Sequence, residues 1–146
     1  MKKTKKSLVT PYNYFAESVR KNSALLIVGY SFGDLHINSI IDRMTALHGE
    51  NRKIVVITFV HPDYRKNDKW HINARAMLKE NSGWLGKNEL LFYAKASEDD
   101  STPLGDITFK YKDHATSNNG KVKIYFEGFK DTVKNHSDEI IRFLTT

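Results

Sequence analysis

The sequence contains no cysteine among its 146 residues, which excludes disulfides, thiolate metal sites and a cysteine nucleophile. It also lacks any apolar run close to the roughly 20 residues that a membrane-spanning helix needs. Neither a GxGxxG turn nor a GxxxxGK[ST] phosphate loop occurs in it. No apolar segment of a signal peptide follows the Lys-rich start, so we expect a cytoplasmic protein with no membrane partner.

Acidic charge is scarce only at the beginning of the chain. The net charge is +6, and four of these charges come from the first residues, Lys2, Lys3, Lys5 and Lys6. The rest carries 19 basic against 17 acidic groups. We therefore interpret residues 1–9 as a solvated basic tail and residues 10–146 as a single domain. Because nucleic-acid-binding domains carry their basic groups on the folded surface, we do not expect a nucleic-acid partner.

The first part of the domain has the pattern of helix, strand and helix. Thr10 is a suitable N-cap and Pro11 suits the first helical position. The apolar run Ala24–Tyr30 does not alternate with polar residues, which predicts a strand covered on both faces. Apolar residues at helical spacing follow Asp34, and Gly49 is a suitable stop.

The pattern then repeats. A second apolar strand is predicted over Ile54–Val60, a helix over Asp68–Glu80 and a third strand over Glu89–Lys95. The connections are long enough for parallel pairing, so this β-α-β-α-β order predicts half of a Rossmann-like, doubly wound parallel sheet.

Alternating patterns mark the last third of the chain. Residues 107–112 and 122–126 alternate between apolar and polar, and Asn119-Gly120 between them is a strong turn signal. They predict an antiparallel β-hairpin. A C-terminal helix with apolar residues at 140, 141, 143 and 144 follows, for which Ser137 and Asp138 are candidate caps or first-turn residues. The predicted class is α/β.

The most informative segment is Leu26–Asn38, LIVGYSFGDLHIN, where a strand ends at a glycine and a helix begins after Asp34. Open α/β sheets bind ligands at such turns. Gly29 permits close approach of a ligand to the backbone, and Ser31 offers a hydroxyl. The Asp34 carboxylate would repel phosphate but could accept hydrogen bonds from ribose hydroxyls. The spacing fits an ordinary strand–turn–helix equally well.

GYSFGDLHIN after an apolar LLIV strand resembles the C-terminal half of the sirtuin-like NAD-binding domain. The match is to the bacterial branch found in anti-phage defence, which reads GYSF-x-D-x-H-I-N at this turn, and KVKIYFEGFKD before an amphipathic helix is similar to its continuation. The resemblance implies NAD as substrate or ligand. It implies binding of the adenosine side of NAD by six residues: Gly29, Tyr30, Ser31, Asp34, Thr58 and Ala96.

The resemblance covers only half of such a domain. Neither the family's GAGxS loop nor its Asn-x-Asp segment and catalytic histidine is present, so no catalytic residue is assigned. We expect the chain to be a truncated or split NAD hydrolase that is inactive alone. Its partner at the unpaired edge of the first strand would be the N-terminal half, another protein chain or a second copy. The alternative is a non-enzymatic module that binds a nucleotide or a protein.

The histidines invite a metal or catalytic interpretation. His36 lies in the motif at a predicted helix start, where an imidazole is more often a surface or capping residue. The remaining histidines are scattered along the chain, at positions 48, 61, 71, 114 and 136. No two histidines stand at i and i+4 with a glutamate between them, as in a zinc-protease motif, so we interpret them as structural and predict no metal site.

Overall fold

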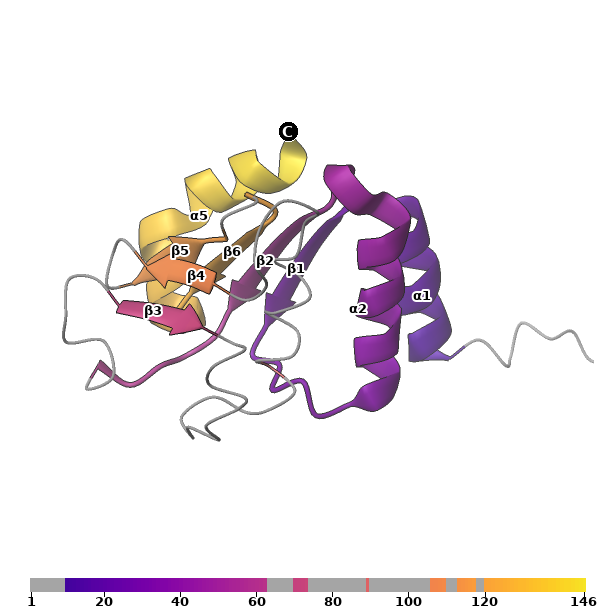
Figure 1. Cartoon of the computed structure of the whole chain (residues 1–146), viewed down its shortest axis with the longest axis horizontal. Coiled ribbons are helices and arrows are strands. Elements are labelled where there is room, and N and C mark those ends of the chain that lie inside the picture. The colour runs from indigo at the N-terminus through magenta and orange to yellow at the C-terminus, as the bar shows by residue number, and fades with distance from the viewer. Residues whose placement is uncertain (1–9, 63–69, 74–88, 90–105, 110–112, 118–119) are drawn as a thin grey trace, which may run out of the picture.

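The structure, a computed structural model, describes residues 10–62, 70–73, 89, 106–109, 113–117 and 120–146. Its main body has three layers (Figure 1). Helices α1 (Pro11–Lys21) and α2 (Leu35–His48) cover one face of a sheet, and α5 (Phe129–Thr145) packs on the other. No helix in the described ranges has the length and apolar character needed to cross a bilayer.

The central sheet has four strands in the order β1-β2-β6-β5. Their bounds are β1 Ala24–Val28, β2 Lys53–Ile57, β5 His114–Thr116 and β6 Val122–Tyr125. The first three in spatial order are parallel, and β5 is antiparallel to β6. The α/β class is thus confirmed, with parallel strands, an antiparallel hairpin and a C-terminal helix.

The predicted ends of α1 and α2 are confirmed by their hydrogen bonds. The Thr10 hydroxyl accepts from the backbone N–H of Asn13 at 3.2 Å, and Pro11 opens α1. Gly49 follows α2 with φ of +49°, a left-handed conformation that favours glycine, and begins the short 3-10 helix η2 (Gly49–Asn51).

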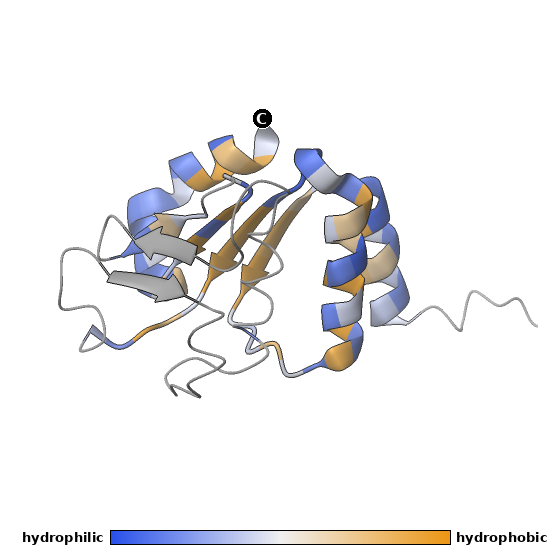
Figure 2. Cartoon of the chain, viewed as in Figure 1, coloured by the Kyte–Doolittle hydropathy of each residue, from blue (hydrophilic) through white to orange (hydrophobic). Residues whose placement is uncertain are grey.

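The hydrophobic core lies on both faces of β2 and β6. Ile54 and Val56 of β2 face α1 and α2, whereas Val55 and Ile57 face α5, and all four are at most 2% exposed. Figure 2 shows the mostly apolar strands of the sheet between helices that carry both polar and apolar residues. The continuous apolar run of β2 is therefore explained as predicted, because a parallel strand between two helical layers buries both of its faces.

β1 differs from the prediction, because it is not covered on both faces. Ile27 is buried, but Leu26 and Val28 on the opposite face are 45% and 43% exposed. The reason is the position of α5, whose Ile140 and neighbours pack on β2 and β6. β1 is also the edge strand, so within the described residues its outer edge has no strand partner.

The predicted helix over Asp68–Glu80 is wrong at Trp70–Asn73, which form strand β3. β3 pairs antiparallel with β4 (Asp106–Phe109) in a separate two-stranded sheet. Backbone pairing between distant segments outweighs the weak helical preference of so short a segment, and tryptophan and isoleucine also favour strands. The rest of the predicted helix lies outside the described residues.

The third parallel strand of the sheet is β6. Of the predicted strand Glu89–Lys95 only Glu89 is described, and its backbone is helical. The predicted hairpin has the right second strand but a different first one: β6 pairs with His114–Thr116, which the sequence pattern assigned to the turn. Gly120, with φ of +72°, provides the predicted turn between them.

α5 begins eight residues before its expected caps. It follows Gly128 and starts at Phe129, so Ser137 and Asp138 lie inside the helix. Gly128 has φ of +86°, a conformation that only glycine adopts readily, and this sharp break permits the helix to start immediately after β6.

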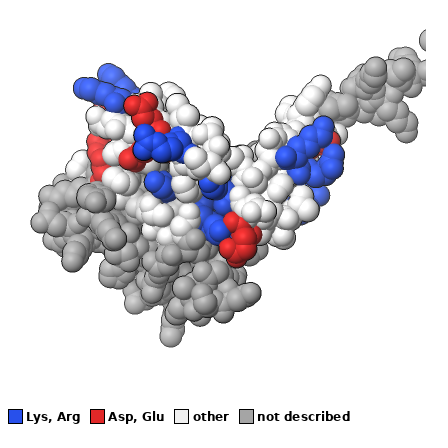
Figure 3. Space-filling view, turned by 90° about the horizontal axis from the view of Figure 1, so that it is seen from above, with Lys and Arg blue, Asp and Glu red and all other residues white. Residues whose placement is uncertain are grey.

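Charged side chains of both signs are mixed on the face shown in Figure 3. Lys121 and Glu50 form an ion pair at 3.1 Å, and Arg20 and Glu17 form one at 2.6 Å. The four lysines of the N-terminal tail lie outside the described residues.

Candidate functional site

The turn between β1 and α2 uses two left-handed backbone positions. Gly29 has φ of +63°, and its N–H donates to the carbonyl of Ile57 at 3.1 Å, which extends the parallel ladder by one residue. Phe32 has φ of +62° although it is not a glycine, and its ring is fully buried. Burial of this aromatic side chain offsets the unfavourable backbone conformation and anchors the loop to the core.

Asp34 caps α2. Its Oδ1 accepts from the backbone N–H groups of His36 at 2.9 Å and Ile37 at 3.2 Å, and its Oδ2 accepts from the Tyr12 hydroxyl at 2.9 Å. The bond from Ile37, together with the Tyr12 and His36 contacts, outweighs desolvation and lowers the pKa of the carboxyl. A carboxylate thus occupies the positive end of α2 and leaves no place there for a phosphate.

Tyr30 and Asn38 close the same turn. The Tyr30 hydroxyl lies 2.6 Å from Oδ1 of Asn38 and 2.9 Å from the carbonyl of Asp34. The Asn38 amide donates in turn to the carbonyl of Phe32 at 2.9 Å. The tyrosine, aspartate and asparagine of the motif therefore hold the loop shape, and the His36 ring packs edge-on against Tyr12.

A pocket of about 460 Å³ opens at the carboxyl ends of β1 and β2. Its volume falls within the range of about 300–1,000 Å³ that is usual for small-molecule sites. Among the described residues, its lining consists of Val28, Gly29, Tyr30, Ser31, Ile57, Thr58, Phe59, Glu89, Gly128 and Phe129. Four of the six predicted residues are thus brought together, namely Gly29, Tyr30, Ser31 and Thr58. Asp34 is not among the lining residues, and Ala96 lies outside the described residues.

The start of α5 forms one wall of this pocket. Gly128 offers no side-chain cap, and its own N–H donates to the carbonyl of Thr58 at 3.0 Å. The first N–H groups of a helix carry partial positive charge, so this 17-residue helix presents its positive end where Gly128 and Phe129 line the pocket. The start of α2 is occupied by the Asp34 carboxylate, whereas α5 follows a glycine and has Asp131 in its first turn without a capping hydrogen bond from any side chain.

Two aromatic rings and one carboxylate complete the lining. Phe59 and Phe129 are 63% and 57% exposed, which is unusual for phenylalanine and suits stacking on a flat ligand. Glu89 is 6% exposed, and a carboxylate there can accept hydrogen bonds from hydroxyl or amino groups. Sequence reasoning missed all three, because they come from separate segments that only the tertiary structure brings to one place.

Comparison with protein-family models, with curated protein sequences and with solved structures returned no match.

Proposed function

We propose that the chain binds the adenosine side of NAD, as the corresponding half of a sirtuin-like domain would. The observation that carries this proposal is the pocket at the carboxyl ends of β1 and β2, with Gly29, Ser31 and Thr58 in its lining. Ligands of open α/β sheets bind at this end of the strands.

The chemistry of the lining suits a nucleotide. The uncapped start of α5 would receive a phosphate group, and the Phe59 and Phe129 rings would stack on the adenine. The Glu89 carboxylate would accept from the ribose hydroxyls, the role that the sequence assigned to Asp34. Cleavage of the bond between nicotinamide and ribose would then need catalytic groups from a partner segment docked beside β1, as in a split NAD hydrolase of the defence type.

Titration calorimetry with ADP-ribose and with NAD tests this proposal. The informative variant is Phe59→Ala, which removes an exposed ring of the pocket, and the matched control is Tyr14→Ala, which removes a 70% exposed ring from α1. Stacking of a base on an aromatic side chain contributes about 1–3 kcal/mol, so the Phe59 variant should bind about 5- to 150-fold more weakly. The control should bind as the unchanged protein does.

The second candidate is a non-enzymatic interaction module. It is favoured by the exposed apolar side chains of the edge strand, Leu26 and Val28. If the folded protein binds neither ligand at millimolar concentration, or if Phe59→Ala leaves the affinity unchanged, the nucleotide proposal is wrong and this alternative takes its place.

A further inference from the structure

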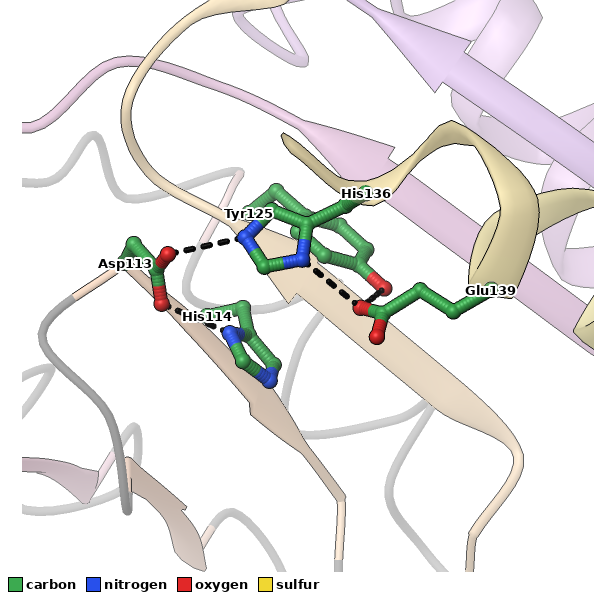
Figure 4. Close-up of polar contacts among 5 residues, drawn as sticks. All are labelled: Asp113, His114, Tyr125, His136 and Glu139. Carbon is green, nitrogen blue, oxygen red and sulfur yellow. Dashed lines mark hydrogen bonds and ion pairs between the residues drawn. The ribbon is translucent and has the colours of Figure 1, made fainter. Parts of the chain in front are cut away.

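A second group of polar side chains lies on the α5 face of the sheet, where β5 pairs with β6 (Figure 4). Its members are Asp113, His114, Tyr125, His136 and Glu139. Asp113 and His114 come from the start of β5, Tyr125 from the end of β6, and the other two from α5. None of them lines the nucleotide pocket.

The Asp113 carboxylate lies between two imidazole rings. Its Oδ1 is 2.7 Å from Nδ1 of His114, and its Oδ2 is 2.8 Å from Nε2 of His136. One donor atom from each of the three residues falls within 4.8 Å of the other two. Three potential metal ligands therefore converge although His136 is 22 residues from His114 and 23 from Asp113 in the sequence.

The second ring nitrogen of His136, Nδ1, contacts a carboxylate, as the second nitrogen of a metal-binding histidine normally does. This Nδ1 lies 3.0 Å from Oε1 of Glu139, and the Tyr125 hydroxyl donates to the same oxygen at 2.6 Å. When a metal ion displaces the hydrogen on Nε2, the carboxylate that accepts from Nδ1 keeps the other ring hydrogen in place and leaves the Nε2 lone pair for the ion. That Nε2 is the atom directed at Asp113.

The surroundings hold these side chains in place. His114 and Tyr125 are paired in the β5–β6 ladder and their rings stack at 5.4 Å, while the two histidine rings lie 4.7 Å apart. The N–H of Phe126 donates to the carbonyl of Asp113 at 2.8 Å. The three ligand side chains are 13–25% exposed, so the group is shielded yet reachable from solvent.

We propose that Asp113, His114 and His136 bind a divalent transition-metal ion such as Zn²⁺. Two imidazole nitrogens and one carboxylate oxygen are ligands that this class of ion prefers, at bond lengths of about 2.0–2.2 Å. With bonds of about 2.0–2.2 Å in a tetrahedral site, ligand atoms lie roughly 3.3–3.6 Å apart. The nitrogen–oxygen separations of 2.7 and 2.8 Å would therefore widen by roughly half an ångström or more, and one Asp113 oxygen would turn to the ion. A fourth, tetrahedral position would remain for water, and the bound ion would join the β5–β6 hairpin to α5.

Calorimetric titration of the chelator-treated protein with Zn²⁺ tests this site, and the visible spectrum with Co²⁺ reports the coordination geometry. We expect one ion per chain, a tetrahedral Co²⁺ spectrum and a higher Tm with Zn²⁺. Glu139→Gln alters the shared partner of His136 and Tyr125 but none of the three proposed ligands, and it should weaken binding by about 10- to 100-fold. His136→Ala and His114→Ala should weaken it further.

Two further variants serve as controls, one for Zn²⁺ binding outside the group and one for the role of the Asp113 carboxylate. His36→Ala removes an exposed histidine outside the group and should leave Zn²⁺ binding unchanged. Asp113→Asn preserves the side-chain shape and can still accept hydrogen bonds, so a folded protein that loses affinity would show that the carboxylate is a ligand. The proposal would be overturned if the unchanged protein bound no Zn²⁺. It would also be overturned if the folded His136→Ala and Asp113→Asn variants bound Zn²⁺ as tightly as the unchanged protein does. The five side chains would then be a hydrogen-bonded group without a metal.

Discussion

Single side chains determine the shape of the β1–α2 turn. Tyr30, Asp34 and Asn38 direct their polar groups back into the loop and the start of α2. These residues make the motif recognisable in the sequence, yet their contacts are structural. Gly29 and Ser31 take no part in these side-chain hydrogen bonds. Both line the pocket and Ser31 is exposed, so a ligand can reach them.

The Asp34 cap makes the stability of α2 depend on pH. Hydrogen bonding from Ile37 and Tyr12 lowers the pKa of Asp34 in the folded protein below its usual 3.8. The ionised cap therefore stabilises the fold above the unfolded-state pKa, and this contribution is lost as the pH falls through the lower folded-state value. Asp34→Ala should lower Tm by a few degrees at about pH 7 and by much less at about pH 3.

Thermal unfolding followed by circular dichroism checks this expectation. Asp34→Asn is the matched control, because asparagine also caps helices but does not titrate. A destabilisation by Asp34→Ala that is the same at both pH values would contradict the role of the ionised carboxylate.

At the scale of elements, α5 is held to the sheet by one side only. Ile140 is 6% exposed and packs on the face formed by Val55, Ile57 and Tyr125, whereas the adjacent Ile141 is 60% exposed. The amphipathic pattern predicted the helix and its apolar residues. It could not show where the helix begins, because the start depends on the left-handed Gly128.

The two isoleucines provide a matched pair of variants. Ile140→Ala should lower the free energy of unfolding by about 2–5 kcal/mol, because it leaves a cavity between α5 and the sheet. Ile141→Ala should change it by no more than about 0.5 kcal/mol, since its side chain is largely in water. Urea denaturation measures both, and equal effects of the two substitutions would contradict the packing of α5.

For the molecule as a whole, the outer edge of β1 is a surface that has no strand partner among the described residues. Gly29 donates its N–H to β2, and the carbonyl of Ser23 accepts from Lys53, so the N–H of Leu26 points away from the sheet. An edge with apolar side chains beside it is a template for another strand. We therefore expect the chain to associate through β1 with a second copy of itself.

Leu26→Pro tests this association. It removes an outward N–H, which an edge strand tolerates, and should convert the associated form to monomer in sedimentation velocity at about 100 µM. Leu26→Thr keeps the N–H and suits a strand, so it should still associate. A wild-type chain that stays monomeric at this concentration, or a proline variant that associates equally well, would exclude pairing through this edge.

The sequence by itself determined the local features: the caps of α1 and α2, the doubly covered β2 and the turn at Gly120. Each depends on neighbouring residues or on a periodic pattern, which the chain carries wherever it folds. The resemblance of the Leu26–Asn38 segment to a known family also pointed to Gly29, Tyr30, Ser31 and Thr58, which line one pocket in the structure.

Only the tertiary structure decided which distant segments meet. It pairs Trp70–Asn73 with β4 instead of forming a helix, places Phe59 and Phe129 in one pocket, and brings His114 and His136 to one carboxylate. These contacts join residues that share no local pattern. They form because packing α5 on the sheet and pairing distant backbones lower the free energy more than local preferences do.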